Sequence, residues 1–324
     1  MPSPVRILHS LWRVHAPLTL SALLTASVTL FFIIGIFADP RVITDAPAWL
    51  KPTKFGVSIT LYTLTLTWIL GFIKGRKWLV NILGWTVIIA FALEWVAIIT
   101  QVVRGTTSHF NIATPFDTAL WSLMGTAIVV LWVANFVIAG LLLFQRFENP
   151  AFAWSLRLGV LITVVGMGLG FLMTSPTAQQ LAGWEAGGPV TIAGAHTVGA
   201  PDGGPGLPVV GWSTTGGDLR APHFVGMHAL QVIPFFGWLV SRRRRWRTRT
   251  RVALVWTASG FYLGVTALLT LQALRAQPII YPDALTVGLF TGLVAIGGLA
   301  AWLAVQLPRA QKQKVAYVQG IDRV

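Results

Sequence analysis

Residues 78–100 read WLVNILGWTVIIAFALEWVAIIT, an apolar run that contains a single charged residue, Glu94. A transmembrane helix needs about 20 apolar residues to cross about 30 Å of hydrocarbon, so this run predicts a spanning helix. Glu94 lies six residues before Thr100, which at about 1.5 Å per residue puts it about 9 Å below the membrane surface. Because an unpaired carboxylate there is costly, we expect Glu94 to be protonated, paired or facing a wet cavity.

The rest of the chain repeats this apolar pattern. Hydrophobic residues make up 55% of the chain, charged residues make up 10%, and the mean hydropathy is +0.70. This composition is typical of an integral membrane protein. We therefore expect an all-α fold with a single transmembrane domain over residues 1–324, built from about eight helices. They are predicted near residues 17–38, 55–73, 78–100, 118–144, 153–173, 222–240, 252–274 and 284–306.

Basic residues alternate between the connections and predict the topology. One set of segments carries Arg6, Arg13, Lys74, Arg76, Lys77, Arg146, Arg157, the run Arg242 to Arg251, Arg309, Lys312 and Lys314. The other set carries only Arg41, Lys51, Lys54, Arg104, Arg220 and Arg275. The positive-inside rule places the first set and both termini in the cytoplasm, in a bacterial inner (plasma) membrane. On the outer side, Lys51 and Lys54 are expected to be snorkelling anchors.

The arginine run Arg242 to Arg251, within SRRRRWRTRTR, is the densest charge cluster of the chain. We expect it to bind anionic lipid headgroups of the bilayer, since each arginine near such a surface contributes about 1 kcal/mol. Nucleic-acid binding is not expected, because the run is short, lies at the membrane and has no soluble fold beside it.

The long outer loop, residues 174–221, is rich in glycine and proline. A loop of this length is unusual without a function or disorder. It keeps apolar residues such as Trp184, Ile192 and Trp212, so it is expected to cap the outer face as a lid. The alternative is a floppy insertion.

Glu94 and His228 are both predicted about six residues inside their helices, so they could meet. A carboxylate bound to one imidazole nitrogen leaves the other nitrogen free to bind a metal or a proton. Five residues separate His223 from His228, about 140° around a helix, so these two cannot chelate one ion from one face. A cofactor or metal site would instead combine His109, His223 and His228, with Glu94 as a further metal ligand. Haem b or a non-haem metal ion fits such donors.

Asp218 and Arg220 lead into the helix of His228 and complete the predicted catalytic set of Glu94, His228, Asp218 and Arg220. Asp218 lies near the positive end of that helix. The two residues form an interfacial ion pair, gate the pocket, or hold an anionic substrate headgroup; the sequence leaves these alternatives open.

Two stretches, EWVAIITQVVRGTTSHFN at 94–111 and STTGGDLRAPHFVGMHALQ at 213–231, resemble an uncharacterised group of bacterial multipass membrane proteins. This resemblance implies a multipass membrane fold and no particular activity.

Three functions stay open. The first is a haem- or metal-dependent membrane oxidoreductase that uses the outer His/Glu site. The second is a proton-coupled small-solute transporter, and the third is a noncatalytic membrane subunit or sensor. Because the polar residues gather at one face instead of crossing the bilayer, the sequence favours an enzyme over a transporter.

A reporter-fusion map tests the predicted topology. Fusions within the arginine run should report a cytoplasmic location, and fusions within residues 174–221 should report the opposite side of the membrane. An external location for the arginine run would overturn the proposed orientation of the site.

Overall fold

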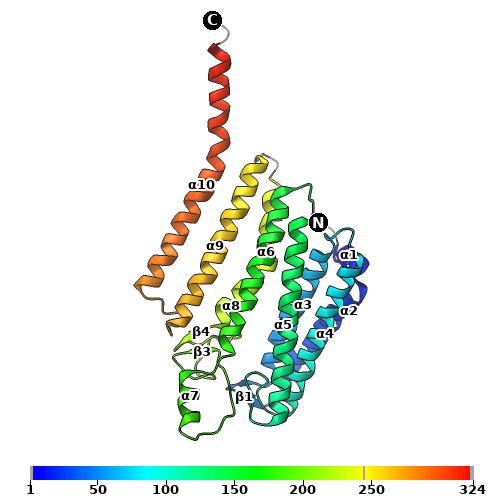
Figure 1. Ribbon diagram of the computed structural model, residues 1–324, viewed down its shortest axis with the longest axis vertical. Coiled ribbons are helices and arrows are strands. Elements are labelled where there is room, and N and C mark those ends of the chain that lie inside the picture. The colour runs from blue at the N-terminus through cyan, green and yellow to red at the C-terminus, as the bar shows by residue number, and fades with distance from the viewer. Residues whose placement is uncertain (1–2, 244, 322–324) are drawn as a thin grey trace.

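The computed structural model describes residues 3–243 and 245–321. Long helices dominate it (Figure 1). The helices are α1 Pro4–Val14, α2 Ala16–Ala38, α3 Leu50–Leu70, α4 Lys77–Val103, α5 Pro115–Phe144, α6 Pro150–Gly168, the 3-10 turn η1 Leu169–Met173, α7 Ala178–Glu185, α8 Arg220–Ser241, α9 Thr248–Leu274 and α10 Ala284–Ile321.

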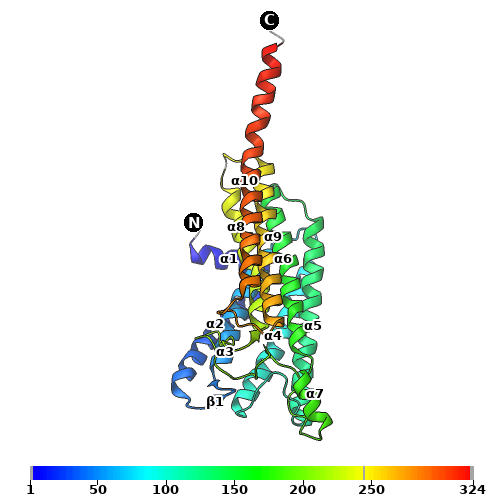
Figure 2. The same ribbon diagram turned by 90° about the vertical axis from the view of Figure 1, so that its left-hand side faces the viewer.

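Helices α2 to α6 and α8 to α10 lie side by side and run alternately up and down (Figures 1 and 2). This arrangement gives the bundle two ends. We call the end with connections 39–49, 104–114, 174–219 and 275–283 the loop end. We call the end with connections 71–76, 145–149 and the α8–α9 connection the arginine end; Arg244, part of the predicted lipid-binding run, lies outside the described residues.

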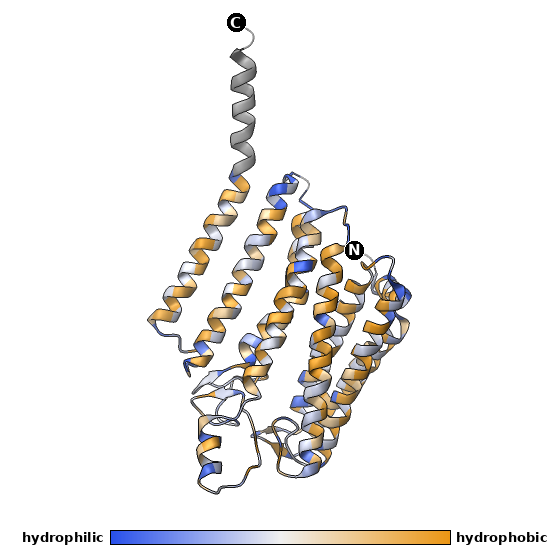
Figure 3. Ribbon diagram, viewed as in Figure 1, coloured by the Kyte–Doolittle hydropathy of each residue, from blue (hydrophilic) through white to orange (hydrophobic). Residues whose placement is uncertain are grey.

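Within the described residues, seven helical segments are long and apolar enough to cross a membrane. They are Ala16–Ala38, Lys77–Val103, Pro115–Phe144, Pro150–Glu185, Arg220–Ser241, Thr248–Leu274 and Ala284–Gln306. Figure 3 shows apolar colour along their lengths and polar colour near their ends. This agrees with the predicted helical membrane bundle. Helix α3 covers most of the remaining predicted segment and packs against α2, but it is richer in threonine, so its crossing stays a prediction.

Helices α6 and α8 approach closely at two glycines. A Cβ atom on Gly166 would lie 2.2 Å from the carbonyl carbon of Gly226. Small residues allow this close approach of two helix backbones. By contrast, a Cβ atom added to Gly288 on α10 would have no neighbour within 4 Å.

The long loop between η1 and α8 folds over the loop end. It contains α7 and the strand β3, Thr197–Val198, which pairs antiparallel with β4, Gly217–Asp218. A backbone bridge between Asn111 and Ile192 ties it to the α4–α5 connection. A second two-stranded sheet, β1 Val42–Ile43 with β2 Ala46–Pro47, lies between α2 and α3. The loop therefore packs against the ends of several helices.

The Gly166–Gly226 contact predicts a stability effect. Gly166→Val would force α6 and α8 apart, and overpacking of this kind costs about 1 to 3 kcal/mol. We expect a lower unfolding temperature of the detergent-solubilised protein for Gly166→Val. Gly288→Val makes the same change at an open helical position and should cost less; equal losses would contradict the packing account.

Candidate functional site

Four aspartate–arginine ion pairs lie at the loop end. They involve all four arginines that sequence analysis assigns to this side. The pairs are Asp39–Arg41 at 2.7 Å, Asp117–Arg104, Asp218–Arg220 at 2.6 Å and Asp283–Arg275 at 2.5 Å. Charge-assisted pairs of this kind hold loops against helix ends. These arginines are therefore occupied by structural contacts.

The Asp218–Arg220 pair closes the long loop onto α8. Asp218 is buried and also accepts a hydrogen bond of 2.7 Å from the backbone N–H of Ser213. The Arg220 guanidinium donates to the carbonyl oxygen of Gly211 at 2.5 Å. Of the sequence-based interpretations of Asp218 and Arg220, the ion pair is the one these contacts favour. Their predicted catalytic role stays a prediction.

A second network anchors the α4–α5 connection. Asp117 accepts hydrogen bonds from Arg104 and from Gln101 Nε2, the latter at 2.7 Å, and its other oxygen binds the Thr114 hydroxyl at 2.6 Å. Sequence analysis did not single out Asp117. The available signal was its place directly before the helix predicted over residues 118–144, because a carboxylate near a helix N-terminus is stabilising.

Glu94 lies on the core face of α4 and is only 2% exposed. Its Oε1 atom is buried with no hydrogen-bond partner, and no ion pair reaches its carboxyl group within the described residues. A buried polar atom without a partner is rare and calls for a physical reason. Lys51, at the start of α3, is close enough for its charge to act on Glu94.

The sequence predicts Lys51 to be a snorkelling anchor, and that role stays a prediction. It is half-buried, and within the described residues its ammonium group makes no hydrogen bond or ion pair. Lys54, one turn later, donates to the Val210 carbonyl oxygen of the long loop at 3.2 Å. The charges of Glu94 and Arg220 both act on Lys51. Sequence reasoning interpreted Lys51 as an anchor because a lysine at a helix end is usually a surface residue.

The predicted contact between Glu94 and His228 has no counterpart among the hydrogen bonds of the described residues. The Nδ1 atom of His228 lies 3.2 Å from Oε1 of Gln231, which itself donates to Thr65 Oγ1 at 3.3 Å. The ring of Phe224 covers His228 at a centroid distance of 4.2 Å. His228 thus belongs to a separate polar strip between α8 and α3.

His109 and His223 both lie at the loop end, His109 in the α4–α5 connection and His223 in the first turn of α8. The Nδ1 atom of His223 donates to the Gly166 carbonyl oxygen at 2.7 Å, so a neutral ring keeps Nε2 as an acceptor. The His109 ring packs between Phe55 and Trp121, each at a centroid distance of 5.5 Å. Its Nδ1 atom is 3.1 Å from the Ser108 hydroxyl.

His109 is held as a neutral imidazole. Burial lowers its pKa well below the usual value, and the charges of Lys51, His196 and His223 act in the same direction. The charge of Lys51 acts on Glu94, His109 and His196, and His223 is linked to them through its mutual influence with His109 and His196. We group these residues as the Lys51–Glu94 cluster: Lys51, Glu94, His109, His196 and His223.

His196 lies in the long loop, just before β3. Its Nδ1 atom lies 2.8 Å from Asp202 Oδ2, and its ring packs on Phe110 at 4.8 Å. Burial lowers the pKa of His196, against the opposing effect of Asp202. Histidine in a glycine-rich loop carries no periodic signal, so its burial could not be read from the sequence.

No group of three or more His, Asp or Glu side chains in residues 3–243 and 245–321 is placed to hold a metal ion. The predicted metal set of His109, His223, His228 and Glu94 therefore lacks geometric support. Its binding role stays a prediction.

The chain matches no protein-family model, no curated protein and no solved structure at a significant level. The function must therefore be argued from the geometry.

The neutral state of His109 predicts a pH effect on stability. The unfolded state takes up a proton as the pH falls below about 6.5, whereas folded His109 does not. We expect the unfolding temperature to fall from about pH 7.5 to about pH 5, and to fall less in His109→Gln. His9→Gln, at an exposed site on α1, is the control; an equal pH response in all three proteins would contradict this.

Proposed function

We propose that the protein is an integral membrane enzyme that acts on a small molecule by acid–base chemistry at the Lys51–Glu94 cluster. The observation that carries this proposal is the Glu94 carboxyl group, which is 2% exposed and has a buried oxygen atom without a partner. Ionisable residues inside a membrane are functional candidates by default. The neighbouring arginines are already paired, so Glu94 and Lys51 are the groups left for a ligand.

Glu94 is suited to accept or donate a proton, and Lys51 to stabilise the negative charge that develops on the ligand or on the carboxylate. Both act in a region of low dielectric, where such interactions are stronger than in water. His109 and His223, with neutral rings, would orient polar groups of the ligand. The ligand would enter from the loop end, beneath the long loop that Asp218 and Arg220 close.

The other two functions have less support. A transporter needs polar groups across the full membrane. Toward the arginine end, the described core of α3 and α4 offers the hydroxyl groups of Thr63 and Thr67 among apolar side chains such as Leu66, and it holds no ionisable group like Glu94. A haem- or metal-dependent oxidoreductase would need metal-binding side chains gathered at one point, and the described residues contain no such group of three or more. A noncatalytic subunit would require a protein partner at the same face.

A ligand screen tests the proposal. Purified protein is heated with small acids and neutral metabolites, because a ligand at 100 times its dissociation constant stabilises the folded state by about 2.7 kcal/mol. We expect at least one compound class to raise the unfolding temperature of the wild type, and Glu94→Gln and Lys51→Gln to abolish that shift.

The matched controls are Glu148→Gln and Lys77→Gln, which remove exposed charges at the arginine end and should keep the ligand effect. Compounds that are turned over by the wild type and not by Glu94→Gln would identify the reaction. A ligand effect that survives in Glu94→Gln, or flux across proteoliposomes that requires Glu94 without turnover, would refute the enzyme proposal.

A further inference from the structure

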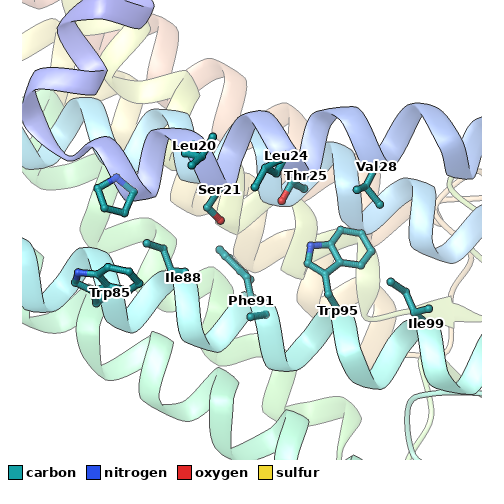
Figure 4. Close-up of a pocket in the computed structure, with 12 residues that line it drawn as sticks. Leu20, Ser21, Leu24, Thr25, Val28, Trp85, Ile88, Phe91, Trp95 and Ile99 are labelled. Carbon is teal, nitrogen blue, oxygen red and sulfur yellow. The ribbon is translucent and has the colours of Figure 1, made fainter.

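A groove of about 500 Å³ lies between α2 and α4. Figure 4 shows the two helices facing each other across it, with Trp85 and Trp95 on α4. Its lining is apolar apart from two hydroxyl groups. The residues are Pro17, Leu20, Ser21, Leu24, Thr25 and Val28 on α2 and Trp85, Ile88, Phe91, Ala92, Trp95 and Ile99 on α4.

On α2 the length of the groove is close to the depth of one membrane leaflet. From Pro17 to Val28 it covers about 17 Å of α2, and from Trp85 to Ile99 it covers about 21 Å of α4. One leaflet is about 15 Å deep, half of the hydrocarbon thickness. An acyl chain that enters from the arginine end and extends for about one leaflet would therefore fill most of the groove.

Helix α1 lies at the end of the groove that faces the arginine end and crosses the direction of the bundle (Figure 2). The join between α1 and α2 is fixed by His15, which is buried, accepts from the Leu18 N–H at 3.0 Å and packs on Trp85. Trp85 in turn lines the groove. The start of the groove and α1 are thus parts of one surface.

Helix α1 is amphipathic. Its apolar residues Val5, Leu8 and Trp12 remain 75%, 36% and 46% exposed, so the bundle does not cover them. At 100° per residue they share one side of the helix, and Arg6 and Arg13 share the other. Such a helix lies in the membrane interface with its apolar side toward the acyl chains.

The charges around this surface are all positive. Arg6 and Arg13 on α1 and Lys77 at the start of α4 are exposed, and residues 1–38 contain no acidic residue. Basic groups at this depth attract anionic headgroups. We propose that α1 and the groove form a binding site for one anionic phospholipid, whose acyl chain lies between α2 and α4 and whose headgroup contacts the arginines of α1.

Labelling tests this site directly, because the chain contains no cysteine. A fluorophore is attached to Ala92→Cys in the groove, or to Val133→Cys on the exposed side of α5 as control. Each protein is reconstituted with brominated phosphatidylglycerol or brominated phosphatidylcholine as a minor lipid. We expect phosphatidylglycerol to quench the label at position 92 preferentially, with no preference at position 133.

Arg6→Gln and Arg13→Gln should each weaken this preference about fivefold, the contribution of one arginine near an anionic surface. Leu24→Trp should fill the groove and abolish it. Equal quenching by both lipids at both positions, meaning bulk lipid only, would overturn the site. Disulfide-linked dimers through Ala92→Cys, with no lipid preference, would also overturn it and indicate a second copy as the occupant.

Discussion

The aspartate–arginine ion pairs of the loop end are the interaction on which the site depends. The connections there are rich in glycine and proline and form little regular structure, so their backbone alone cannot hold them in place. Asp218–Arg220 and Asp117–Arg104 fix them to the ends of α8, α4 and α5. Because the arginines of the loop end are engaged in these ion pairs, the positive charge available for chemistry comes from Lys51 and Lys54.

The helical membrane bundle could be predicted from the sequence because the hydrocarbon core imposes a length and a composition on each span. The same reasoning identified Glu94 as a buried acid, since a single charge in an apolar run is easy to see. Partners were harder to predict. The expected partner His228 hydrogen-bonds with Gln231, whereas Lys51 comes from the start of α3. Depth along a helix is readable from sequence, but rotation about the helix axis depends on packing.

The loop histidines show a second limit of prediction from sequence, after the rotation of a helix about its axis. His196 belongs to a segment without periodicity, and its burial depends on contacts with Asp202 and Phe110 that lie outside any helix. The proposed site combines a neutral His109 with Lys51 and Glu94, a set that would respond to pH and favour polar or anionic ligands. At the arginine end, exposed basic residues and an apolar groove match the headgroup and the chain of a lipid. The two ends are thus proposed to bind different kinds of ligand.

Infrared spectroscopy of the protein in membranes tests the central claim most directly. The difference between wild type and Glu94→Gln isolates the carboxyl band of Glu94, and its intensity can be followed as the pH is changed. The account predicts that this band titrates, and that Lys51→Met moves the midpoint because the two groups interact. A Glu94 band that does not respond to pH, or a midpoint that Lys51→Met leaves unchanged, would contradict it.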